Sequence, residues 1–269
     1  MSSISDTYQN IGFALQNRVM TVSLNRPERL NAISHELHEE LGRVFIDLAK
    51  DDGVDVIILR GNGKAFSAGG DLKGMHAHML EVGSPGHYMS FSTAKRIVYS
   101  LLELEKPIIA QVHGACYGLG ATIALLCDVV FMAESATIGD PHVGAGVVAG
   151  DGGAIIWPQL VGYARAKEFL MTGNVLSASH AERIGLVNHM VADADLDATV
   201  RAFAAQLAEG SQDAIRWTKV SVNIGLRQLA HSILDASLAY ELVTMRSADH
   251  ADAITAFSNK QKPTFRRKV

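Results

Sequence analysis

The chain has 269 residues, of which 48% are hydrophobic and 19% charged, a composition typical of a globular protein with a substantial core. This length suits one large domain or a domain with an appendage. The formal net charge of −4 excludes a global field that would attract nucleic acid or an anionic membrane, so a phosphate-bearing ligand would need local groups to hold it.

Strands and helices alternate over the first half of the chain. Residues 18–24 place Met20, Val22 and Leu24 on one side, the period-two pattern of a strand. Ser34, a favoured helix-capping residue, precedes apolar residues at helical spacing up to Leu48. Further buried strands are expected at 54–61, 107–114 and 128–134, and further helices at 88–104 and 118–128. The alternation predicts α/β architecture.

Residues 76–86 show little periodicity and contain Gly83, Pro85 and Gly86, which predicts a mobile loop. It forms part of the stretch 74–92 from which the wall of a ligand pocket is expected.

From Ala154 onward the pattern becomes helical. Three successive segments end in Gly162, Gly173 and Gly185, the residue type that most often closes a helix in a left-handed conformation. Residues 186–191 are expected to form one more short strand, and residues 195–259 show only helical periodicity. We therefore divide the chain into a core at 1–195 and a C-terminal helical region at 196–269, which packs on its own core or on a neighbouring subunit.

The sequence contains no visible targeting or membrane signal. Residues 1–10 are polar, and no apolar run is long enough to span a bilayer. Cys116 and Cys127 lie in apolar stretches without metal-type spacing, as expected of small reduced thiols. These features predict a cytoplasmic protein that binds neither nucleic acid nor membranes.

Two glycine-rich turns each follow a buried strand. They are Ser-Ala-Gly-Gly-Asp at 67–71 and Tyr-Gly-Leu-Gly at 117–120, and the second leads into a helix. Unpaired backbone N–H groups occur in such turns and at helix N-termini. Two such donors aimed at one carbonyl oxygen stabilise the negative charge of an enolate, and losing one costs about 2.7–4 kcal/mol. Each turn alone is also explained as a strand exit that needs positive φ.

Other nucleotide and hydrolase motifs are weak or absent. Residues 144–149 match the G-x-G-x-x-A dinucleotide pattern, but no strand leads directly into them. The sequence has no Walker-type G-K-[ST], no G-x-S-x-G and no H-E-x-x-H. These absences count against a nucleotide hydrolase, a standard serine hydrolase and a zincin.

Taken together, five segments resemble the enoyl-CoA hydratase/isomerase (crotonase) superfamily, and the likeness runs in order from about residue 11 to residue 262. The segments are 24–33, 61–75, 106–134, 139–153 and 164–191. The resemblance implies a crotonase-like spiral of ββα units with a C-terminal helical trimerisation region, assembled as a homotrimer or a dimer of trimers. It also implies an acyl-CoA thioester substrate, with coenzyme A as part of that substrate and no separate cofactor.

The same resemblance assigns the oxyanion-hole donors to the N–H groups of Gly70 and Leu119. It implies a coenzyme A site formed by residues of both halves of the chain: Glu28, Arg29, Leu30, Ala68, Asp71, Leu72, Lys73, Phe257 and Lys260. The last two would reach the coenzyme from the C-terminal helix or from a neighbouring subunit. Lys73 and Lys260 are equally explained as solvated surface amines.

The sequence departs from the superfamily pattern at both glutamates that activate water in the hydratases. Thr122 stands at the first position and His142, after Pro141, at the second. A threonine hydroxyl can orient water but cannot serve as the base. Asp151 lies in a glycine turn where dienoyl-CoA isomerase relatives have an acidic residue at the adjacent position. We therefore expect Asp151 to be the acid/base carboxylate, with His142 as its partner and Thr122 orienting water or substrate.

Alternative roles remain for these side chains. His142 also fits a hydrogen-bonded core histidine, and Asp151 also fits the cap of a helix starting near Gly153. His113 follows the strand-end Val112 and is expected to support the turn as a hydrogen-bond donor. His76, His78 and His87 lack a fourth ligand and tetrahedral-site spacing, so we expect no metal site.

The leading hypothesis is an enzyme that stabilises a thioester enolate and hydrates or isomerises an unsaturated acyl-CoA. The alternatives are hydrolysis of a C–C bond or thioester by His142 and Asp151, and a non-catalytic acyl-CoA-binding homologue without the two usual glutamates.

Overall fold

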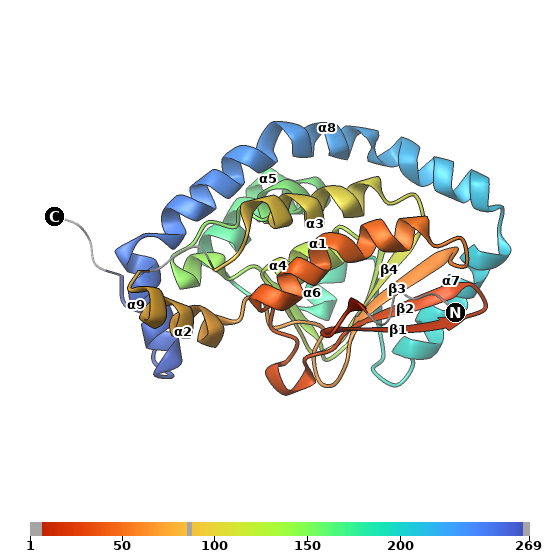
Figure 1. The fold of residues 1–269 in the computed structure, drawn as a ribbon. Helices are drawn as coiled ribbons and strands as arrows, with labels where there is room; N and C mark the ends of the chain where they lie inside the picture. Colours follow the sequence, from red (N-terminus) through yellow and green to blue (C-terminus); the bar gives the residue numbers. More distant parts are fainter. Residues whose placement is uncertain (1–6, 85–87, 266–269) are drawn as a thin grey trace.

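The computed structural model describes residues 7–84 and 88–265 (Figure 1). Its main sheet has six strands in the order β1-β2-β3-β4-β6-β9, with β1 antiparallel to β2 and all other neighbours parallel. The strands are β1 (Ile11–Gln16), β2 (Val19–Leu24), β3 (Val56–Gly61), β4 (Ile108–Val112), β6 (Val129–Ala133) and β9 (His189–Val191). All the strands expected from the sequence are therefore present.

Strand β1 was not expected from the sequence. Its outer half is exposed, so it lacks the apolar run of a buried strand. The hairpin to β2 turns at Asn17 and Arg18, which both have positive φ (50° and 63°), as a two-residue type I′ hairpin requires.

A second, smaller sheet lies next to the functional site. It pairs β5 (Ala115–Tyr117) with β7 (Thr137–Gly139) in parallel, and β7 with β8 (Leu176–Ser177) antiparallel. These strands have two or three residues each, too few to show a period in the sequence.

The helices of the core begin and end largely where the sequence predicts. The Ser34 hydroxyl caps α1 (His35–Lys50) by accepting a hydrogen bond from the Leu37 N–H at 3.3 Å. The other core helices are α3 (Phe91–Glu103), α4 (Leu119–Leu125), α5 (Gly153–Thr172) and α6 (Ala178–Arg183), and α7 (Leu196–Glu209) is the first helix of the C-terminal region. Gly173 and Gly185 follow the ends of α5 and α6 with positive φ, as predicted, whereas Gly162 has φ 79° and ψ 158° and lies at a kink within α5. Helix α7 packs against β2, β3, β4 and β6.

The prediction of a mobile loop at 76–86 is wrong for residues 76–82, which belong to the helix α2 (Leu72–Val82). The Asp71 carboxylate caps it by accepting from the Gly74 N–H at 3.1 Å, and it ends at Gly83 with φ 75°. Tertiary packing of α2 against the C-terminal helix α9 compensates for its weak periodicity. Pro85, Gly86 and His87 lie outside the described residues.

The two C-terminal helices pack on the core of their own chain. Helix α8 (Gln212–Met245) has 34 residues, a length of about 51 Å, and arches over α3 and α5 (Figure 1). Helix α9 (Ala248–Ser258) turns back beside α2. Among the described residues, no helix is both long and apolar enough to cross a membrane.

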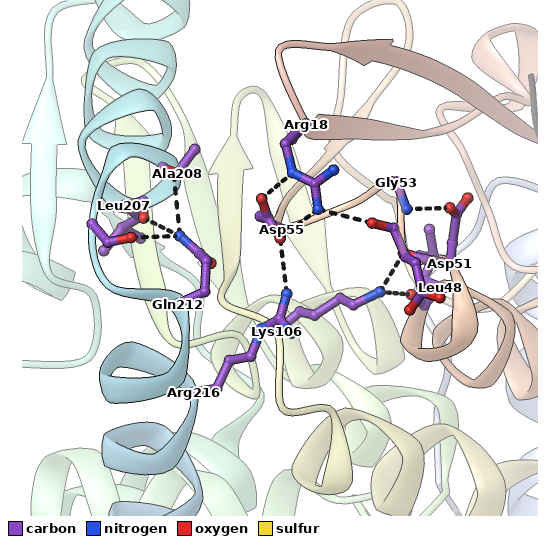
Figure 2. A network of polar contacts seen from close by, with 12 residues as sticks. Arg18, Leu48, Asp51, Gly53, Asp55, Lys106, Leu207, Ala208, Gln212 and Arg216 are labelled. Carbon is purple, nitrogen blue, oxygen red and sulfur yellow. Dashed lines mark hydrogen bonds and ion pairs between the residues drawn. The ribbon is translucent and has the colours of Figure 1, made fainter.

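A polar network fixes the beginning of α8 to the sheet (Figure 2). Arg216 of α8 donates to Asp55 Oδ1 at 2.9 Å, and Arg18 of the β1–β2 hairpin donates to the same oxygen at 3.0 Å. Lys106 donates to the carbonyls of Leu48 and Asp51 at 2.7 and 2.6 Å. Because one end of this rigid helix is held here, residues near its other end have a defined position over the core.

Candidate active site

The two glycine-rich turns lie side by side. The Ser67 N–H donates to the Ala115 carbonyl at 3.0 Å, and the Tyr117 N–H donates back to the Ser67 carbonyl at 3.0 Å. A Cβ atom added to Gly118 would lie 3.7 Å from Gly69 Cα. Both glycines have positive φ (54° and 86°), so the turns need residues without a side chain at these positions.

The N–H groups of Gly70 and Leu119 follow these two glycines directly. Within residues 7–84 and 88–265, neither group donates a hydrogen bond to another protein atom. Leu119 is the first residue of α4, where backbone N–H groups have no partner inside the helix. Both residues line one cavity of about 290 Å³. The cavity therefore receives two free backbone donors from adjacent turns.

The wall of this cavity is mainly apolar. Leu72 and Met75 of α2, Met245 of α8 and Phe257 of α9 line it, together with Met89. Unbranched methionine side chains adapt to ligands of different shape. The cavity can therefore hold an apolar chain next to the two amides.

His142 also lines the cavity, next to Gly118 and between two carboxylates. Its Nδ1 is hydrogen-bonded to Asp140 Oδ1, and its Nε2 lies 3.4 Å from Asp151 Oδ2. Burial opposes protonation of the ring, but the Asp140 and Asp151 carboxylates outweigh it and raise the pKa of His142 well above its usual range. The imidazolium form is therefore favoured near neutral pH.

Asp151 is buried and lines the same cavity. Helix α5 begins at Gly153 with Gly152 as its N-cap and no side-chain cap, so the structure does not support the alternative of Asp151 as a helix cap. Two contacts from α8 hold its loop: the Ser237 hydroxyl donates to the Gly150 carbonyl at 2.7 Å, and the Val148 N–H donates to Thr244 Oγ1 at 3.1 Å.

Thr122 does not line the cavity as expected for a residue that orients water or substrate. It is fully buried in α4, and its hydroxyl donates to Asp151 Oδ1 at 3.5 Å. Its contact is with the carboxylate of Asp151, whose orientation it can restrict.

Glu241 of α8 lines the cavity with Asp151 and His142, although no motif in the sequence indicated it. The residue is 5% exposed, and its Oε2 atom has no hydrogen-bond partner in the part of the chain that the structure describes. Burial and the Asp151 carboxylate raise the pKa of Glu241 well above its usual range. Glu241 follows Leu234 and Leu238 on the buried side of α8, and a carboxylate in such an apolar stripe is a signal that the sequence did contain.

The residues expected at a coenzyme A site differ in where they lie. Ala68 and Leu72 line the cavity, as does Phe257, which reaches it from α9 of the same chain. The exposed residues, which do not line it, are Glu28, Arg29, Leu30, Lys73 and Lys260. The Leu30 carbonyl accepts from the Ala68 N–H at 2.9 Å, which joins the exposed turn at 27–30 to the first glycine turn.

Both carboxylate oxygens of Asp71, which was expected at the coenzyme A site, contact other groups of the protein. Besides capping α2, its carboxylate pairs with Arg26 at 3.1 Å between Oδ2 and Nη2. His113 contacts the Gly63 carbonyl at 3.0 Å, which connects the end of β4 to the loop that precedes the first glycine turn.

Asp140, His142 and Asp151 form the one group in the described part of the chain whose ligand atoms could meet at a metal ion, within 4.8 Å of one another. Nδ1 of His142 is already in close contact with Asp140, so we interpret the group as a proton-transfer unit. His76 and His78 belong to no such group in this part of the chain, and His87 lies outside it.

The family model for enoyl-CoA hydratase/isomerase matches residues 14–268. The chain belongs to the enoyl-CoA hydratase/isomerase family. A short-chain-enoyl-CoA hydratase from Clostridium acetobutylicum is 33% identical over 259 residues, which cover 94% of this chain and 96% of the relative. The 1,2-epoxyphenylacetyl-CoA isomerase of Escherichia coli is 32% identical over 254 residues, with coverage of 93% and 96%.

Solved structures of the family confirm the fold. The crystal structure of an enoyl-CoA hydratase/isomerase from Mycobacterium paratuberculosis matches with a TM-score of 0.84 at 32% identity, over 91% of this chain and 97% of that one. The crotonase-like α/β fold expected from the sequence is therefore confirmed, and the chain is an enzyme of the hydratase/isomerase type. Both lyases and isomerases occur among its relatives, so membership of the family leaves the reaction open.

Proposed function

We propose that this enzyme hydrates or isomerises an unsaturated acyl-CoA. In this proposal the thioester oxygen lies between the N–H groups of Gly70 and Leu119, and Asp151 and His142 move the protons. The observation that carries it is the position of two free backbone donors in the same cavity as a histidine–carboxylate pair. The family relatives that act on enoyl-CoA thioesters support the substrate class.

The two amides account for the electrostatic part of the reaction. When a proton leaves the α-carbon, or when the β-carbon is attacked, negative charge gathers on the thioester oxygen. Two fixed donors stabilise that charge without reorganisation, each by about 2.7–4 kcal/mol. The proposal needs no separate cofactor, because coenzyme A is part of the substrate and only protons move.

The side chains account for proton transfer. Asp151 accepts a proton from the substrate or from water, and the His142 imidazolium donates one. The Nε2–Oδ2 separation of 3.4 Å is short enough for a proton to return from Asp151 to His142 after a small movement. Asp140 holds the histidine ring in place and favours its charged form.

A substrate series tests this proposal. The protein is incubated with crotonyl-CoA, a 3-enoyl-CoA, a 3-oxoacyl-CoA and a saturated acyl-CoA, and the absorbance of the conjugated thioester and the release of free thiol are followed. Loss of absorbance with crotonyl-CoA indicates hydration, and a gain with the 3-enoyl-CoA indicates isomerisation. Cleavage of the 3-oxoacyl-CoA or thiol release alone would assign a hydrolase. Tight acyl-CoA binding without any turnover would contradict the enzymatic role.

A further inference from the structure

We call the cavity of about 290 Å³ that Gly70 and Leu119 line the acyl cavity. A second, smaller cavity of about 30 Å³ adjoins it. His38 of α1, Asp151 and Glu241 of α8 line it, and we call it the polar niche. It shares Met89, Leu119, Asp151, Glu241 and Met245 with the acyl cavity. The niche is therefore an extension of the active site, and Asp151 lines both cavities.

Two of its side chains carry buried polar atoms that have no hydrogen-bond partner among the described residues. These atoms are His38 Nδ1, in a residue that is 1% exposed, and Glu241 Oε2, in a residue that is 5% exposed. A buried polar group without a partner costs about 1–3 kcal/mol. Two such groups, in residues that line the same small cavity, favour a polar occupant.

The niche is large enough for water. About 10–15 Å³ of space for the centre of a water molecule is enough to hold one, and a buried water usually makes two to four hydrogen bonds. His38, Glu241 and Asp151 together offer three polar partners. An acyl chain would leave the histidine nitrogen and the carboxyl oxygen unsatisfied.

The charge state of the niche also suits a neutral ligand. Burial lowers the pKa of His38 to about 4, so its ring is neutral at physiological pH. Burial and the Asp151 carboxylate raise the pKa of Glu241, which favours the protonated carboxyl. A neutral imidazole and a neutral carboxyl can each donate or accept a hydrogen bond.

We propose that the polar niche is the binding site of the water molecule that this enzyme adds to its substrate, with His38 and Glu241 as water-binding residues. This inference rests on the proposed function and narrows it to water addition. The hydratases of the superfamily bind water with two glutamates, and this chain has Thr122 and His142 at those positions. The inference assigns the binding of water to side chains of α1 and α8 instead.

The step is balanced in atoms and electrons. Asp151 takes one proton from the water, and the water oxygen forms a bond to the β-carbon while the double-bond electrons move to the thioester enolate. His142 then gives a proton to the α-carbon. Asp151 returns its proton to His142, so the substrate has gained one H and one OH and both side chains are restored.

Two activities of the same site separate the binding of water from the rest of the chemistry. Hydration of crotonyl-CoA needs the water, whereas hydrogen–deuterium exchange at the α-carbon of a saturated acyl-CoA needs only proton transfer and the amide pair. Glu241→Leu and His38→Leu fill the niche with apolar atoms. We expect each to lower hydration at least 100-fold while α-exchange and acyl-CoA binding stay within about threefold of wild type.

Tyr240→Phe is the matched control on α8, because this side chain is exposed and lines neither cavity; it should leave both activities unchanged. Glu241→Gln keeps the shape and the polarity of the niche and should retain hydration within about tenfold, even if Glu241→Leu does not fold. Hydration that survives Glu241→Leu, or α-exchange that falls together with hydration in a folded variant, would overturn the proposal.

A crystal structure of the wild-type protein provides a readout that does not depend on activity. Ordered water within hydrogen-bonding distance of Glu241 Oε2 and His38 Nδ1 is the expected result, and an empty or apolar niche would overturn the proposal. If the wild type neither hydrates enoyl-CoA nor exchanges α-protons, the proposed function fails and the reactant role of the water fails with it. A water seen in the niche in that case would support the binding site alone.

Discussion

His142 Nε2 lies 3.4 Å from Asp151 Oδ2, in a ring whose other nitrogen is hydrogen-bonded to the buried Asp140 carboxylate. The histidine thus bridges two carboxylates at the wall of a cavity that two free backbone amides also line. This arrangement provides a proton donor and a proton acceptor in direct contact. In the proposed function it takes over proton transfer from the pair of glutamates that the superfamily pattern leads one to expect at positions 122 and 142.

The state of His142 should set the alkaline limb of the pH profile. Because the two carboxylates raise its pKa, the imidazolium is present at neutral pH, and turnover that needs this form falls as the pH rises through the His142 pKa. Asp140→Asn removes one of the carboxylates and lowers this pKa. We expect the alkaline limb of kcat to move to lower pH in this variant.

The exposed surface of α8 supplies the control for this pH experiment. Asp235→Asn makes the same chemical change at a side chain that is 64% exposed, and it should leave the profile in place. An alkaline limb that does not move in Asp140→Asn would show that His142 is not the group that titrates.

The contribution of the Leu119 amide can be measured by deleting the N–H group. Proline lacks this donor and is tolerated at the first residue of a helix, which is the position of Leu119 in α4. Leu119→Ala removes the same side chain and keeps the N–H group. We expect kcat of Leu119→Pro to be about 100- to 1,000-fold below that of Leu119→Ala. Equal activity of the two variants would exclude this amide as an oxyanion donor.

The elements that the sequence predicts well are those with a strong period or a distinct terminus. The buried strands β3 and β4 and the Ser34-capped helix α1 belong to this class. Helix α2 was misread as a loop because only Met75 is buried along its length, and its packing partner α9 lies about 170 residues further along the chain. Contacts of this range have no signature in a local pattern.

The site was predictable to the extent that its residues lie in compact motifs. Gly70 and Leu119 lie in two short glycine-rich segments, and the structure brings these segments together. His38 and Glu241 come from two helices far apart in the sequence, and their only signal was a titratable residue on an apolar helix face. Trimer formation stays a prediction, which a measurement of molar mass in solution would test.

The loop that carries Asp151 depends on close packing against α8. A Cβ atom at Gly150 would lie 2.3 Å from the Ser237 carbonyl oxygen and 2.7 Å from Glu241 Cβ, and neither can move without the helix. Gly150→Ala should therefore lower the free energy of unfolding by about 1–3 kcal/mol and also reduce turnover.

Gly225→Ala is the matched control for this substitution. Gly225 lies in α8, the helix that Gly150 packs against, and among the described residues no neighbouring atom is within 4 Å of the added carbon. The substitution should therefore raise stability by about 0.5–1 kcal/mol. Urea denaturation measures both effects. A Gly150→Ala variant as stable and active as wild type would show that this contact does not position Asp151.

In the proposed function, the Asp151 carboxylate accepts the proton. Asp151→Asn keeps the size of the side chain and removes its basicity, so the measurement is kcat on the preferred enoyl-CoA substrate, with acyl-CoA binding as the test of an intact site. We predict that kcat falls at least 100-fold while binding is retained. A kcat within about tenfold of wild type, or about 1.4 kcal/mol in activation free energy, would contradict this role for Asp151.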